Sequence, residues 1–146
     1  ISSTFSDYFI PETSESGSAF AKWISREFRL ANSSTGLDVK LSAVLYETDN
    51  ILVYYKVRPE ANTAPLSDIP WIPFNGTGLP NNSSQIAIRN NDVTNPAQLG
   101  VNDMREISYS EQGISPFTSF AIKIVMQTEN AAKVPIIDDF RAIATE

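Results

Sequence analysis

Towards the C-terminal end, side chains alternate between two faces in the first half of SFAIKIVMQTENAAKVPIIDDFRAIATE (residues 119–146). One face of its first half carries four large apolar side chains: Phe120, Ile122, Ile124 and Met126. A period of two over this length predicts a half-buried β-strand. After the polar break TENAAK, the segment VPIIDDFRAIA predicts a second strand, because Pro135 cannot donate a ladder hydrogen bond and suits a strand start. We expect these two strands to close an antiparallel β domain.

The same alternation occurs twice between residues 37 and 58, on either side of the short segment TDN (48–50). The side chains expected to face the core are Leu37, Val39, Leu41, Ala43 and Leu45, followed by Ile51, Val53, Tyr55 and Val57. Asp and Asn tolerate the left-handed backbone of tight turns. Residues 37–58 therefore predict a β-hairpin that ends at Pro59.

Three further segments are expected to be strands. In residues 19–31 (AFAKWISREFRLA) the apolar spacing fits a helix as well as a strand. We favour a strand there, because the neighbouring segments are all strands and aromatic and β-branched residues are well represented. Residues 84–90 and 105–111 predict two short strands, the second with Ile107 and Tyr109 on one face.

Residues 59–83 predict a long loop that contains an apolar patch. The patch comprises Pro65, Leu66, Ile69, Pro70, Trp71, Ile72, Pro73 and Phe74. A loop with this much apolar mass usually packs against the fold, so we expect it to form a lid on one edge. Residues 1–18 are rich in Ser and Thr and predict a linker or N-terminal arm, which leaves residues 19–146 as a single domain.

About seven or eight strands, long loops and no secure helix predict an all-β fold. We expect an antiparallel β-sandwich, either jelly-roll-like or immunoglobulin-like. Consecutive strands joined by long loops favour the jelly-roll-like form.

A length of 146 residues and a hydrophobic content of 42% suit one globular domain with a full core. The longest apolar runs are only a few residues, so we expect no membrane insertion. The chain starts with ISSTFSDYF and has no initial Met, which suggests a piece of a longer polypeptide.

The sequence contains no cysteine and no histidine. Disulfides, thiol catalysis and thiolate metal sites are thereby excluded, as are the usual zinc ligand and the commonest general base. We expect no enzymatic activity, no metal site and no cofactor. A hydrolase that uses Asp and Glu alone, as glycosidases do, is the third and least favoured hypothesis.

The net charge is −6, with 11 basic residues scattered among 17 acidic ones. Nucleic-acid binding needs a concentrated basic surface. Neither nucleic acid nor an anionic membrane surface is therefore an expected partner, and solubility explains the acidity.

Aromatic residues offer a candidate sugar-binding surface, because their rings stack on the apolar faces of sugars. The candidate residues are Trp71, Tyr54, Tyr46 and Arg58. Recognition residues tend to collect in loops, where Trp71 lies. Packing in the lid is nevertheless the favoured interpretation of Trp71, so a carbohydrate-binding module is the second hypothesis for function.

Acidic and amide side chains form groups that also have a simpler structural interpretation. Adjacent strand residues point to opposite faces, so Asp138 and Asp139 predict a bent strand start in which Arg141 pairs with a cross-strand acid. Two oxygen-rich groups resemble calcium ligands: Glu47, Asp49 and Asn50, and Asn90, Asn91, Asp92 and Asn95 near Asn102 and Asp103. Neither has the spacing of a calcium loop, so we expect turns.

Three phrases together carry a resemblance to a known family: LDVKLSAVLYETDNILVYYKVRP, DIPWIPF and SFAIKIVMQTENAAKVPIIDDFRAIA. They resemble a domain in structural proteins of contractile-tailed phages that infect marine cyanobacteria, over residues 19–145. The closing phrase is also similar to the end of galactose-binding-type β-sandwiches, a likeness that concerns fold more than function. Neither resemblance supplies catalytic residues.

The phage resemblance implies a non-enzymatic structural or interaction domain of a tail, baseplate or fibre component, located in the virion. Its expected partners are other virion proteins or a glycan of the host surface, and it could form a homo-oligomer. An acidic, β-rich domain without Cys or His suits this role, and the apolar loop 65–74 is a candidate assembly surface.

Overall fold

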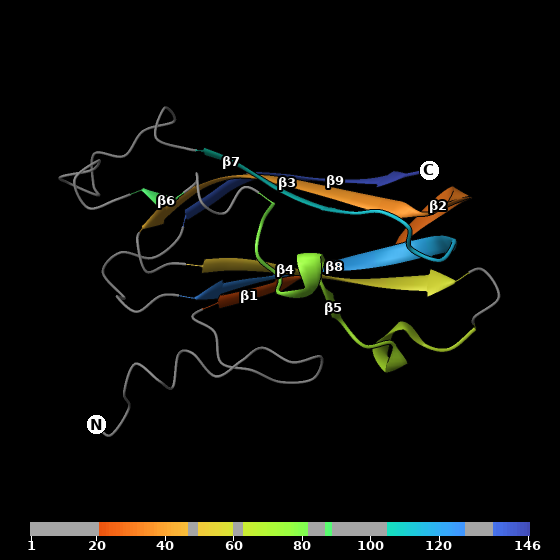
Figure 1. Ribbon diagram of the computed structural model, residues 1–146. Coiled ribbons are helices and arrows are strands. Elements are labelled where there is room, and N and C mark those ends of the chain that lie inside the picture. The colour runs from red at the N-terminus through yellow and green to blue at the C-terminus, as the bar shows by residue number, and fades with distance from the viewer. Residues whose placement is uncertain (1–20, 47–49, 60–62, 82–86, 89–104, 128–135) are drawn as a thin grey trace, which may run out of the picture.

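The computed structural model describes residues 21–46, 50–59, 63–81, 87–88, 105–127 and 136–146. Two sheets lie one above the other as two layers (Figure 1). Two short 3-10 helices, η2 (Leu66–Asp68) and η3 (Phe74–Gly76), are the helices of the described part. This confirms the predicted all-β antiparallel sandwich. Residues 1–18, predicted as a linker or arm, lie outside the described residues.

The five-stranded sheet has the order β1-β8-β4-β5, and β2 also pairs with β8. Its strands are β1 (Ala21–Ile24), β2 (Phe28–Ser34), β4 (Asn50–Pro59), β5 (Ile72–Pro73) and β8 (Phe117–Gln127). In the four-stranded sheet β3 pairs with β7, β9 and β6, the last in parallel over two residue pairs. Its strands are β3 (Gly36–Tyr46), β6 (Ala87–Ile88), β7 (Arg105–Glu111) and β9 (Ile136–Thr145).

The longer strands alternate between the two sheets along the chain: β3, β7 and β9 belong to one, β4 and β8 to the other. This alternation agrees with a jelly-roll-like character. The strands predicted in residues 19–31 and 105–111 are confirmed, although the first is divided into β1 and β2. Of the strand predicted over residues 84–90, the structure describes Ala87 and Ile88, which form β6. The two closing strands are confirmed as β8 and β9, which lie in opposite sheets.

The predicted hairpin over residues 37–58 is wrong. β3 pairs with β7 and β9, whereas β4 pairs with β8 and β5. Alternation indicates only that one face of each strand is buried, and a hairpin and two strands in facing sheets both produce that pattern. The apolar faces of β3 and β4 meet across the core instead of lying side by side.

The core between the sheets consists of the side chains that the alternation assigns to it. Its buried strand residues include Leu37, Val39, Leu41, Ala43, Ile51, Val53, Tyr55, Ile107, Tyr109, Phe120, Ile122 and Ile124. The Tyr109 hydroxyl joins the two sheets, because it donates a hydrogen bond of 2.6 Å to the carbonyl of Ile51. Burial raises the pKa of Tyr109, so the hydroxyl keeps its proton and remains a donor.

One edge of the sandwich, called here the closed edge, is covered by residues 74–81, which follow β5 and run towards β7 (Figure 1). Phe74 is fully buried, with its ring edge-on to Tyr55 at 4.9 Å and to Tyr109 at 6.1 Å between centroids. The Asn81 N–H donates to the carbonyl of Ser108 at 2.7 Å and fixes the segment to β7. Phe74 of the predicted apolar lid therefore packs into this edge, whereas Pro65, Pro70 and Ile72 of the same patch are exposed.

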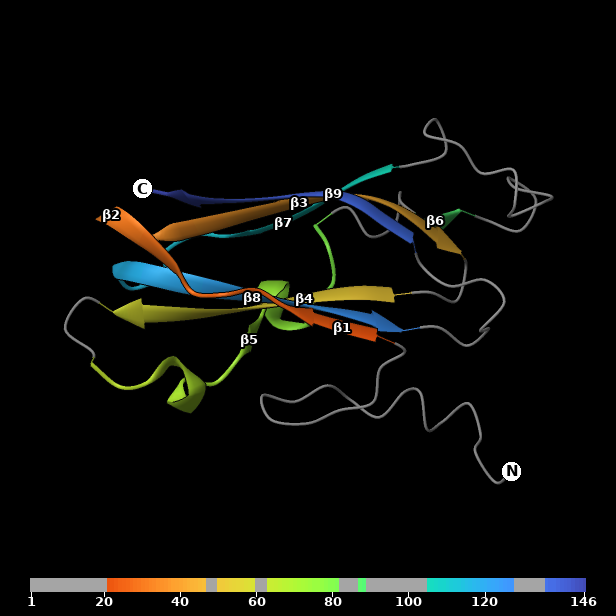
Figure 2. The same ribbon diagram turned by 180° about the vertical axis from the view of Figure 1, so that it is seen from behind.

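The opposite edge, called here the open edge, lies between β1 and β2 of one sheet and β9 of the other (Figure 2). Trp23 of β1 meets Phe140 of β9 across it, with ring centroids 5.2 Å apart. Trp23 nevertheless remains 45% exposed, so this contact does not seal the edge.

Candidate functional site

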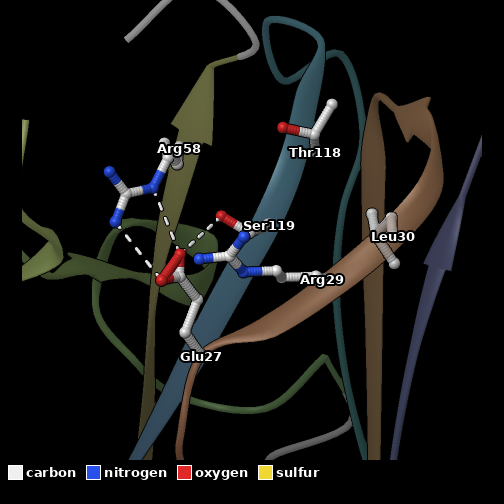
Figure 3. A pocket seen from close by; sticks show the side chains of 6 residues that line it. All are labelled: Glu27, Arg29, Leu30, Arg58, Thr118 and Ser119. Carbon is white, nitrogen blue, oxygen red and sulfur yellow. Dashed lines mark hydrogen bonds and ion pairs between the residues drawn. The ribbon is translucent and has the colours of Figure 1, made fainter. Parts of the chain in front are cut away.

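A polar hollow of about 330 Å³ lies on the outer face of the five-stranded sheet, away from the core (Figure 3). Its lining residues are Glu27, Arg29, Leu30, Arg58, Thr118 and Ser119. Three strands and one strand connection contribute to it, so side chains distant in the sequence converge there. We call this group the polar hollow.

The register of the sheet brings the two arginines to the hollow. Ser119 of β8 is paired with Arg58 of β4 on one side and with Arg29 of β2 on the other. Residues paired in this way point to the same face of a sheet. Glu27 comes from the connection between β1 and β2, and its side chain extends over this row (Figure 3).

A bulge in β8 explains why two consecutive hydroxyls line one hollow. Arg58 pairs with Ser119 but Pro59 pairs with Phe117, so Thr118 is the extra residue in the register. Adjacent residues in a regular strand point to opposite faces, and a bulge removes this alternation locally. The bulge therefore allows Thr118 and Ser119 both to line the hollow.

Hydrogen bonds fix the carboxylate of Glu27 at the centre of the hollow. Arg58 donates from Nε and Nη2 to its two oxygens at 3.1 and 3.3 Å, and Ser119 Oγ donates to it at 2.9 Å. Arg58 also donates from Nη1 to the carbonyl of Ala64. The Ser119 hydrogen bond, followed by those from Arg58, lowers the pKa of Glu27.

Arg29 differs from Arg58 in its contacts. Its guanidinium lies beside the Glu27 carboxylate (Figure 3), and its charge also lowers the pKa of Glu27. Within the described part of the chain, however, no hydrogen bond or ion pair holds the Arg29 side chain. The hollow thus contains one guanidinium that hydrogen bonds hold in the fold, that of Arg58, and a second one, on the exposed residue Arg29, without such a bond in the described structure.

The open edge carries two apolar hollows next to each other. The first, of about 330 Å³, is lined by Trp23, Ile124, Met126, Ile137, Asp139 and Phe140. The second, of about 580 Å³, is lined by Phe28, Leu30, Phe120, Phe140, Arg141, Ala142, Ile143 and Ala144. Leu30 also borders the polar hollow, so the apolar and polar surfaces adjoin at this residue.

The four residues predicted to bind sugar lie in three different settings. Trp71 and Tyr54 pack in one small cluster on the outer face of β4, where Tyr54 is buried. Arg58 lies in the polar hollow instead. Tyr46 belongs to β3, and its side chain lies outside the described structure. A sugar-binding role for these four residues together stays a prediction.

Two lysines pack beneath Trp71. The Nζ atoms of Lys56 and Lys123 lie 4.5 and 5.4 Å from the centre of its ring, and both lysines are buried. Burial, and then the charge of Lys123, lowers the pKa of Lys56, whose ammonium donates to the carbonyl of Leu66 at 3.1 Å. These contacts support the interpretation of Trp71 as a packing residue of the lid.

The acidic pair on β9 has the structure expected from its sequence. Asp139 has a φ of 63° and sits at a register shift, because Leu41 pairs with Phe140 and Ser42 with Asp138. Arg141 forms an ion pair with Glu106 of β7 at 3.2 Å, so the predicted bent strand and cross-strand acid are confirmed. In the described residues no group of three or more acidic side chains could hold a metal ion. Most of the predicted calcium groups lie outside these residues.

Sequence reasoning identified only Arg58 among the residues of the polar hollow. Three charged residues, Arg26, Glu27 and Arg29, interrupt an otherwise apolar strand pattern. This interruption is the feature of the sequence that could have indicated the polar hollow. No local sequence pattern indicates that Glu27 and Arg58 meet. Glu27 directly precedes β2 and Arg58 lies on β4, so their contact depends on the pairing of β2 and β4 with β8.

Comparison with protein-family models, curated proteins and solved structures gave no match for this chain. In the part of the chain that the structure describes, no helix has the length and apolar character needed to cross a membrane.

Proposed function

We propose that this chain is a non-enzymatic interaction domain that joins another protein subunit through its open edge. The observation that carries the proposal is the apolar surface of that edge. In the described structure, four large apolar side chains are exposed, and Trp23, Ile24 and Ile143 lie on the strands β1 and β9 that border it. Exposed apolar surface of this kind is typical of protein contacts.

The proposed occupant is an extended strand of the partner subunit. β9 is paired only with β3 in the described part, which leaves its outer row of backbone groups available for a further strand. The bulge at Asp139 breaks the regular edge, so the added strand would follow Phe140–Thr145. Its inward side chains would then cover the larger apolar hollow, beside Phe28 and Leu30.

The resemblance of the three sequence phrases to domains of phage structural proteins supports a virion component as the biological setting. A tail, baseplate or fibre protein is assembled from many subunit contacts, which suits a domain with one covered and one uncovered edge. The absence of Cys and His from the sequence also suits a role in assembly rather than catalysis.

A peptide-display selection on the immobilised protein tests the strand addition. We expect the selected peptides to alternate apolar and polar residues. Ile143→Lys should abolish their binding, because it places a charge on the free edge, where lysine opposes strand addition. Ile72→Lys is the matched control: Ile72 is also an exposed strand isoleucine, 40% against 54%, but it lies at the closed edge.

Equal loss of binding in both lysine variants, or no enrichment of alternating peptides, would contradict the proposed occupant. Light scattering of the purified protein gives an independent readout. A stable dimer that Ile143→Lys dissociates would identify the partner as a second copy and would overturn the choice of a different subunit.

Immunogold labelling of purified contractile-tailed particles tests the setting. Label on the tail, baseplate or fibres is the expected result. Label that stays in the particle-free fraction would remove the virion from the proposal and leave the interaction domain to be judged by the peptide experiment.

A further inference from the structure

We propose that the polar hollow binds a sugar acid, that is, a hydroxylated sugar ring carrying one carboxylate. The hollow lies on the outer face of the five-stranded sheet, whereas the proposed partner strand lies along β9 at the open edge. The inference is therefore independent of the proposed function, and Leu30 is the one side chain used in both.

The charge balance of the hollow favours a single negative charge on the ligand. Glu27 and Arg58 neutralise each other through two hydrogen bonds, at 3.1 and 3.3 Å. Arg29 then remains as one positive charge beside this pair. A guanidinium presents parallel N–H donors that match the two oxygens of a carboxylate, so Arg29 would bind the acid group in a bidentate manner.

The remaining polar atoms suit hydroxyl groups. The Thr118 hydroxyl makes no hydrogen bond within the described structure, and it lines the hollow next to Ser119. The Ser119 hydroxyl donates its hydrogen bond to Glu27 but its oxygen can still accept one, and one oxygen of Glu27 receives a single hydrogen bond. A sugar hydroxyl both donates and accepts, so it can use all three groups.

The shape and rigidity of the hollow suit one small ring. Its volume of about 330 Å³ is at the lower end for ligand sites. Arg58 and Ser119 stand on paired strands and are fixed by their hydrogen bonds to Glu27, and strand pairing with Ser119 fixes the backbone position of Arg29. Leu30 provides an apolar wall for the C–H face of the ring. An acidic peptide would supply the carboxylate but not the ring hydroxyls, so it is the less suitable ligand.

A titration followed by amide NMR signals tests the inference, with D-glucuronate as the probe. D-glucose has the same ring without the acid, and acetate has the acid without the ring; all three are added at equal ionic strength. We expect saturable shifts at Arg29 and Ser119 with glucuronate, and much weaker shifts with either control. Equal shifts with glucose would overturn the role of the carboxylate, and equal shifts with acetate would overturn the role of the sugar.

Three variants test whether the hollow is the site. Arg29→Gln should weaken glucuronate binding by about tenfold or more, because a charge-assisted bidentate contact is lost. Thr118→Val should weaken it less. Arg26→Gln removes the same charge from the connection that directly precedes β2, but Arg26 stacks on Phe28 outside the hollow, so binding should be unchanged.

Equal weakening of glucuronate binding by Arg29→Gln and Arg26→Gln would show that binding depends on net charge alone. It would overturn the polar hollow as the binding site. Ile143→Lys separates the two proposals. It should abolish the partner strand and leave glucuronate binding intact, so failure of one proposal does not imply failure of the other.

Discussion

The two edges of this sandwich both carry an aromatic side chain, but they bury it to different extents. At the closed edge Phe74 enters between the sheets and becomes fully buried against Tyr55 and Tyr109. At the open edge Trp23 only reaches Phe140 and stays 45% exposed. An aromatic side chain therefore seals an edge when backbone hydrogen bonds hold its segment to both sheets, as they hold residues 74–81.

Those hydrogen bonds are specific. The Val53 N–H of β4 donates to the carbonyl of Gly78 at 2.9 Å, and the Asn81 N–H donates to the carbonyl of Ser108 on β7 at 2.7 Å. The Asn75 N–H adds a hydrogen bond of 2.8 Å to the side-chain Oε1 of Glu111 on β7. The segment thus joins the two sheets and closes the core. At the open edge no described segment fills the corresponding position between the sheets, and this difference is the basis of the proposed interaction.

The largest expected effect comes from removing the buried aromatic ring of Phe74. Phe74→Ala should lower the free energy of unfolding by about 3–5 kcal/mol, because it leaves a cavity among well-packed rings. Trp23→Ala, its counterpart at the open edge, should cost about 1 kcal/mol, since half of its surface is already in water. Urea denaturation of both variants measures the difference. Similar losses would show that the edges are equally important for stability.

The next largest effect on stability is expected at the glycines of the segment that carries Phe74. Gly78 has a φ of 85°, and a Cβ there would lie 3.2 Å from Cβ of Leu52. Gly78→Ala should destabilise the protein by about 1–2 kcal/mol through the left-handed backbone, with a further loss from the close contact. Gly76→Ala has a similar φ of 77° but meets nothing within 4 Å, so it should show the backbone cost alone. Equal values for both variants would exclude a contribution from Leu52.

A smaller effect is expected from the hydrogen bond across the core. Tyr109→Phe should cost about 1–2 kcal/mol, because the carbonyl of Ile51 loses its donor in a dry environment. Tyr54→Phe offers a comparison on the outer face of β4, where the tyrosine is nearly as buried but lies in the lid cluster. Denaturation with several probes measures both variants, and a neutral Tyr109→Phe would contradict the role of the hydroxyl in joining the sheets.

The smallest effect is a shift in titration at the polar hollow. The pKa of Glu27 is lowered, first of all by the hydrogen bond from Ser119, so Ser119→Ala should raise this pKa towards its ordinary value. A carboxylate with a lowered pKa contributes stability above its unfolded pKa of about 4.3 and loses that contribution as the pH falls through the lower folded value.

Carboxyl NMR signals followed over acid pH measure the Glu27 titration. Thr118→Val is the control, because Thr118 lines the same hollow without a hydrogen bond to Glu27. An unchanged pKa in Ser119→Ala, or an equal rise in both variants, would contradict the assignment of the hydrogen bond as its main cause.

Much of the fold could be predicted from the alternation of apolar and polar residues with a period of two. The alternation assigned Leu37, Val39, Ile122 and Ile124 to the core, and all four are buried there. It did not reveal which strand pairs with which, because alternation describes one face of a strand and carries no information about its neighbours. The predicted hairpin over residues 37–58 failed for that reason.

The candidate site was harder to predict than the fold. Arg58 was singled out for a sugar surface with Trp71, but its partners are Glu27 and Ser119, at sequence separations that no local pattern encodes. The bulge at Thr118 is a further irregularity, which the strand propensities of the residues do not predict. Sites assembled across several strands depend on register, and register is the property least accessible from one sequence.

The pairing of β3 with β9 also has a consequence for how the chain folds. Gly36 pairs with Thr145, about a hundred residues further along, so one side of β3 lacks a neighbour until β9 has been synthesised. Pairing between such distant segments requires large loops to close before any contact is gained, which makes folding slow. On the ribosome, this edge of β3 would remain unpaired until about a hundred further residues had been added, and an unpaired strand edge is a site that chaperones protect from aggregation.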